Sequence, residues 1–107
     1  MSIDYIFYLS GDTPITTLRS HGFIELSRTD FAIRGTAFGE VLGIIIAQDV
    51  SDDSFTREEL DFKPASELIA TIDLGRYEES IQAIATLASS LIKQHAHVKL
   101  YLNNETL

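Results

Sequence analysis

The sequence predicts an α+β domain in which a mostly antiparallel β-sheet carries one long amphipathic helix on one face and one short N-terminal helix. Two observations support this prediction: segments with period-two alternation recur along the chain, and one long segment near the C-terminus follows the helical period. A length of 107 residues fits a single domain, residues 1–107, with room for a core that needs no disulfide or metal.

The first strand and the short helix are predicted close to the N-terminus. The stretch IDYIFYLS alternates, with Ile3, Tyr5, Phe7 and Leu9 on one side, which is typical of a strand buried mainly on one face. A cap at Asp12 or Thr13, followed by Pro14 at the first helical position, then predicts a helix over Pro14 to Ser20 that Gly22 ends.

Three further strands are predicted as a meander over residues 22–27, 30–35 and 38–48. In the third, regular alternation places Val41, Ile45 and Ala47 on one face and Leu42, Ile44 and Ile46 on the other. Apolar residues on both faces indicate a central strand.

The second half of the chain predicts a strand, the long helix and a last strand. The strand covers residues 66–74, and the helix covers residues 76–97 with an apolar stripe of Tyr77, Ile81, Ile84, Leu87, Ala88, Leu91 and Ile92. In the last strand, Val98, Leu100 and Leu102 lie opposite Lys99 and Tyr101, and Asn103-Asn104 suits a hairpin turn. The sequence stops where a returning strand would begin, so we expect that final strand to be a stub or to be missing.

The negative charge of the chain is concentrated in residues 49–61, called here the acidic segment. This segment holds six acids and one base, which is −5 of the net −8. Such a surface repels nucleic acid and anionic membranes and attracts cationic partners, so no nucleic-acid or membrane partner is expected. We therefore predict a partner-binding site at the six carboxylates Asp49, Asp52, Asp53, Glu58, Glu59 and Asp61.

Targeting and redox signals are few. The longest uninterrupted apolar stretch, Leu42 to Ala47, is too short to span a bilayer, and the N-terminus lacks the basic start of a secretory signal, so a cytoplasmic location is expected. The chain has no cysteine, which excludes a disulfide, a thiol nucleophile and a thiolate zinc site.

Metal and catalytic alternatives are weaker. Asp49, Ser51 and Asp53 match the first ligands of an EF-hand loop, but Ser54 stands where glycine is needed and Leu60 where a bidentate glutamate is needed. His95 and His97 could share a metal only with ligands that no sequence motif supplies, so we interpret them as a helix end and a strand start. No nucleophile elbow, phosphate loop or dinucleotide fingerprint occurs, so we expect a protein that is not an enzyme and that has no cofactor or metal.

Both ends of the sequence resemble a known family. The opening IDYIFYLS with its TP-started helix, the stretch FKPASELIATIDLGRYEESIQAIATLASSLIK and the closing VKLYLNNETL are similar to the Sit-type cognate immunity proteins of contact-dependent toxin exchange. The family pattern continues with one more apolar strand, which is absent after Leu107. The resemblance implies a cytoplasmic protein of bacterial competition that binds a cognate toxin domain and blocks its active site or substrate groove.

The acidic charge is consistent with this class, because inhibitors of cationic nuclease toxins commonly present carboxylates in place of phosphates. The hypothesis is therefore a toxin inhibitor that binds a basic toxin, such as a nuclease, through its acidic surface. A small acidic regulatory or assembly module without a toxin partner is the alternative. An enzyme that uses His95, His97 and the acidic segment is the third hypothesis.

Overall fold

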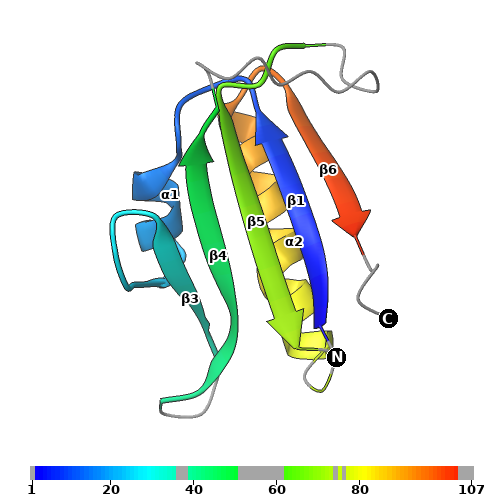
Figure 1. Ribbon diagram of the computed structural model, residues 1–107. Helices are drawn as coiled ribbons and strands as arrows, with labels where there is room; N and C mark the ends of the chain where they lie inside the picture. Colours follow the sequence, from blue (N-terminus) through cyan, green and yellow to red (C-terminus); the bar gives the residue numbers. More distant parts are fainter. Residues whose placement is uncertain (1, 36–38, 51–61, 74, 76, 104–107) are drawn as a thin grey trace.

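The computed structural model describes residues 2–35, 39–50, 62–73, 75 and 77–103 (Figure 1). Six strands form one sheet in the order β2-β3-β4-β5-β1-β6. In chain order the elements are β1 (Ser2–Leu9), α1 (Ile15–Ser20), β2 (Ile24–Glu25), β3 (Asp30–Arg34), β4 (Val41–Asp49), β5 (Ser66–Asp73), α2 (Tyr77–Gln94) and β6 (Val98–Asn103). The residues after Asn103, where the sequence predicts a hairpin turn and a final strand, lie outside the described ranges.

The pairing of the strands confirms the α+β prediction. All five pairs of neighbouring strands are antiparallel, and the first strand lies inside the sheet between β5 and β6. Tyr5, for example, lies opposite Ala70 on one side and Leu102 on the other. The sequence predicted the strands but not this order, in which the N-terminal and C-terminal strands become neighbours.

Both helices lie on one face of the sheet, which we call the helix face. In Figure 1, α2 runs behind β5 and β1. The Thr17 hydroxyl of α1 donates a hydrogen bond to Oε1 of Gln94 in α2, and His21 Nε2 lies 2.9 Å from the Ser90 hydroxyl. Leu18 of α1 and the α2 residues Ile84, Leu87 and Leu91 share one core with the buried side chains of the strands.

The core face of α2 is narrower than predicted. Its buried residues are Ser80, Ile84, Leu87 and Leu91, at the spacing of four, three and four residues that a single helical face requires. Tyr77 and Ile92 were predicted in this stripe, yet their side chains are 42% and 65% exposed. Ile92 lines a groove with Leu100 of β6, and the Tyr77 hydroxyl lies 3.3 Å from that of Tyr5, which is opposite Leu102 of β6.

A β-bulge corrects the predicted faces of β4. Ile33 pairs with Gly43 whereas Arg34 pairs with Val41, so β4 contains one extra residue at Leu42. Leu42 consequently joins Ile45 in the core and Val41 is exposed, the reverse of the prediction from regular alternation. A β-carbon at Gly43 would collide with the Thr71 carbonyl oxygen, so the close approach of β4 to β5 requires glycine here.

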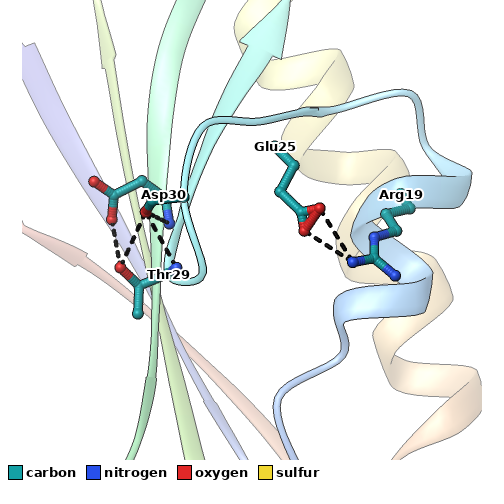
Figure 2. Close-up of polar contacts among 5 residues, drawn as sticks. Arg19, Glu25, Thr29 and Asp30 are labelled. Carbon is teal, nitrogen blue, oxygen red and sulfur yellow. Dashed lines mark hydrogen bonds and ion pairs between the residues drawn. The ribbon is translucent and has the colours of Figure 1, made fainter.

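The far edge of the sheet is tied to α1 by polar contacts at the surface. Arg19 forms an ion pair of 2.9 Å with Glu25 in β2, and the Thr29 hydroxyl donates to Oδ1 of Asp30 at 2.8 Å (Figure 2). An exposed ion pair such as that of Arg19 with Glu25 adds little stability. Within the described residues, no helix is both long and apolar enough to cross a membrane.

The packing of Tyr5 predicts a loss of stability at alkaline pH. Burial, together with the hydrogen bond between the Tyr5 and Tyr77 hydroxyls, raises the pKa of Tyr5 to about 12 from its ordinary value of 10.0. The neutral phenol is therefore favoured in the folded state, and its contribution to stability is complete below pH 10 and declines toward pH 12. Tyr5→Phe should reduce this decline, which urea unfolding at pH 9 and pH 11 would measure; equal slopes in both proteins would contradict the assignment.

Candidate protein-interaction surface

The predicted acidic site begins at the end of β4. Asp49 is the last residue of that strand, is exposed and lies opposite Ser66 of β5. The other five predicted site residues, Asp52, Asp53, Glu58, Glu59 and Asp61, lie outside the residues that the structure describes. What the structure describes is how the chain is anchored on either side of the acidic segment.

Both flanks of the acidic segment are attached to the same end of the sheet. The buried Val50 donates its N–H to the Ala65 carbonyl at 3.0 Å, and Ala65 donates its own N–H to the Leu9 carbonyl at 2.8 Å. The fully buried Ser66 donates its hydroxyl to the Gly11 carbonyl at 2.7 Å. Since these bonds join β1, β4 and β5, the chain is well anchored at Val50 and again at Ala65 and Ser66.

The two histidines considered as metal ligands lie at this end of the sheet as well. His95 donates its N–H to the Leu91 carbonyl at 3.0 Å just after α2, and His97 exchanges hydrogen bonds with Ser10 just before β6. The ring of His97 stacks on Phe62 with centroids 5.2 Å apart. Among the described residues, no group of three or more histidines, cysteines or acids is placed to hold a metal ion.

One serine–histidine contact was not found by sequence reasoning. His21 Nε2 and the Ser90 hydroxyl are 2.9 Å apart, 69 residues distant along the chain. A catalytic pair needs a further group that orients the imidazole, and no carboxylate in the described part of the chain hydrogen-bonds to His21. The His21 ring instead stacks on Phe23 with centroids 6.0 Å apart, so the contact joins α1 to α2.

The face of the sheet opposite the helices, called here the open face, carries an apolar row. Side by side across four strands lie Tyr101 of β6, Ile6 of β1, Ile69 of β5 and Ile46 of β4. Ile46 is 37% exposed, and Ile6 and Ile69 are half-buried. None of the described helices or strands covers this face. The row is partly exposed, most of all at Ile46, whereas Tyr8 on the same face is 3% exposed.

Polar groups surround the apolar row of the open face. On one side, Asp4 accepts a hydrogen bond of 2.8 Å from the Thr71 hydroxyl. On the other side, Glu67 lies opposite Gln48 and Tyr8, and Lys99 lies opposite Tyr8. An apolar centre with a polar rim is the usual anatomy of a protein–protein interface.

The strand β4 leads from the open face to the start of the acidic segment. Gln48 shares the open face with Ile46, whereas Asp49, where the acidic segment starts, alternates to the helix face opposite Ser66. The sequence did contain a signal for this surface, because Ile44 and Ile46 alternate with core residues. That signal was interpreted as burial on both faces, whereas the two described helices both lie on the helix face.

Comparisons with known proteins give no relative. No protein-family model matches the chain, and neither the curated proteins nor the solved structures contain a significant match.

Proposed function

We propose that this protein is a protein-binding domain that acts as an immunity protein, neutralising a cognate bacterial toxin domain in the cytoplasm. The observation that carries the proposal is the open face, where Ile6, Ile69 and Ile46 form an apolar row next to the start of the acidic segment. Exposed apolar strips with polar rims on small domains are typical of partner-binding sites. The resemblance to Sit-type immunity proteins supplies the biological class.

The two parts of the surface would have different roles. The acidic segment would steer a basic toxin toward the protein, because clustered carboxylates raise the association rate through long-range attraction. The open face would then form the desolvated centre of the contact, which holds most of the binding energy in protein interfaces. A toxin that cleaves nucleic acid fits this scheme, since its substrate groove is built to accept negative charge.

The alternative proposal is a small acidic module for regulation or assembly that has no toxin partner. The two proposals share the open face and differ in the partner, so the identity of the bound protein distinguishes them. Under either one, the purified protein should show no turnover of nucleic acids, esters or glycosides and should need no cofactor.

Co-expression with the neighbouring open reading frame, or a pull-down from the native host, tests the proposal. We expect a basic protein to co-purify and the growth of cells that express it to be restored. Ile46→Lys, on the open face, should weaken capture because it places a charge in the apolar row. Ile92→Lys, a more exposed position on the helix face, is the matched control. Equal capture by both variants, or a partner with no toxicity, would contradict the proposal.

A further inference from the structure

The strand β6 forms one edge of the sheet and presents unpaired backbone groups outward. It pairs with β1, and no other strand of the described residues lies beside it (Figure 1). Ser10 donates its N–H to the His97 carbonyl at 3.0 Å, so the backbone of His97 faces β1. The direction of the backbone N–H and C=O groups alternates along a strand, so those of Lys99 and Tyr101 also point toward β1. The backbone groups of Val98, Leu100 and Leu102 point away from the sheet.

Large apolar side chains gather beside this edge on the helix face. Leu100 and Leu102 are 43% and 56% exposed, and Tyr77 and Ile92 of α2 are the other exposed residues at the same edge. These four are among the seven exposed large hydrophobic residues of the described chain. A groove of about 490 Å³ separates α2 from β6, lined by Tyr5, Ile81, Ala85, Ala88 and Leu100 among others.

We propose that this edge binds a second copy of the chain, with two β6 strands paired antiparallel across a two-fold axis at Leu100. The two sheets would then form one continuous sheet of twelve strands, twice the six of one copy. Edge strands with free backbone groups and apolar side chains favour pairing of this kind. The inference does not depend on the toxin proposed as partner, because it rests on the backbone groups of β6 and on Leu100 and Leu102, whose side chains lie on the helix face.

The register at Leu100 is selected by hydrogen bonding and by side-chain pairing. Leu100 lies opposite Leu100 of the second copy, and Val98 lies opposite Leu102, so all the outward N–H and C=O groups of these three residues are paired. On the helix face each apolar side chain meets an apolar one. In a register centred on Tyr101, Leu100 would pair with Leu102 of the second copy. The outward backbone groups of Val98 would then have no partner among Val98, Leu100 and Leu102.

Charge also favours a second copy at this edge. The chain has a net charge of −8, so two copies repel each other over most of their surfaces. The described edge lacks this negative charge. The strand β6 carries no acid between Val98 and Asn103, and Lys93 is the one charged residue that lines the groove. With the axis at Leu100, Lys99 lies opposite Tyr101 of the second copy and not opposite Lys99, which avoids a like-charge pair across the strands.

Disulfide trapping tests the proposed register, and the absence of native cysteine makes it unambiguous. In the proposed dimer, two copies of Leu100→Cys have α-carbons about 5.5 Å apart, within the range that a disulfide spans. In Leu102→Cys the two cysteines lie about 14 Å apart, since four residue steps separate them. We expect Leu100→Cys to cross-link rapidly and Leu102→Cys to cross-link slowly; equal rates, or cross-linking of Leu102→Cys alone, would overturn the register.

Sedimentation equilibrium tests the dimer itself with the unmodified chain. The apparent mass should rise with concentration from 11.9 kDa toward twice that value, and added salt should strengthen the dimer by screening the repulsion of two acidic copies. Leu100→Lys should remain monomeric, while Val41→Lys, an exposed position in β4, should behave as the unmodified chain. A mass of 11.9 kDa at all concentrations and salts would overturn the proposal and leave the edge available to a strand of another protein.

Discussion

Ile84→Asp is expected to unfold the protein. Ile84 is 1% exposed and packs in the core with Leu87 and Leu91 of the same helix. An aspartate there would bury a carboxylate with no counter-charge, which costs about 3–5 kcal/mol. Domains of this size have a total unfolding free energy of about 5–15 kcal/mol, so most or all of the stability would be lost. Thermal melts followed by circular dichroism would measure the effect.

Ile92→Asp is the matched control for this experiment. It introduces the same charge in the same helix, but the Ile92 side chain is 65% exposed and the new carboxylate would stay in water. We expect its melting temperature to remain close to that of the unmodified protein. If Ile84→Asp kept full thermal stability and instead lost partner binding, α2 would be the interface and the core assignment would be wrong.

Reversing four charges of the acidic segment should separate folding from binding. The variant changes Asp52, Asp53, Glu58 and Glu59 to lysine. We expect these charges to lie in water, where they contribute little to stability, so folding should be almost unaffected. Affinity for a basic toxin should fall by several kcal/mol if two or more of these carboxylates form desolvated pairs in the contact.

A second variant controls for the change in overall charge. Asp73→Lys with Glu78→Lys alters the net charge as much as Asp52→Lys with Asp53→Lys does, but at the opposite end of β5 from the acidic segment. We expect Asp73→Lys with Glu78→Lys to have a small effect on toxin association. Asp52→Lys with Asp53→Lys should have a large effect. Similar losses from both would indicate that net charge alone, and not the acidic segment, determines association.

The elements of the fold were predictable because their signals are local. Alternation predicted β1 and β5, the meander pattern predicted β3, and the helical period predicted α2, which begins at Tyr77 and ends at Gln94. The faces of β4 were predicted wrongly at Val41 and Leu42, because the bulge depends on contact between Gly43 and β5. A glycine within a strand is a local signal of a bulge or a close approach, but it does not show which residue is the extra one.

The open face could not be predicted because it depends on strand order. Its row takes one residue each from β6, β1, β5 and β4, and the sequence does not specify that these strands are neighbours. The charges of the acidic segment were visible in the sequence, and the structure adds that the segment starts at Asp49, the last residue of β4. The contact of His21 with Ser90 likewise depends on how α1 and α2 pack.

The most direct test of the toxin-binding proposal is the association rate with the cognate toxin at low and moderate salt. The unmodified protein and the variant with Asp52, Asp53, Glu58 and Glu59 changed to lysine would be compared. If the acidic segment steers a basic toxin, the association rate of the unmodified protein should fall steeply with salt while dissociation changes less. The variant should associate slowly at both salt concentrations. An unchanged affinity and an unchanged salt dependence in the variant would contradict the proposal.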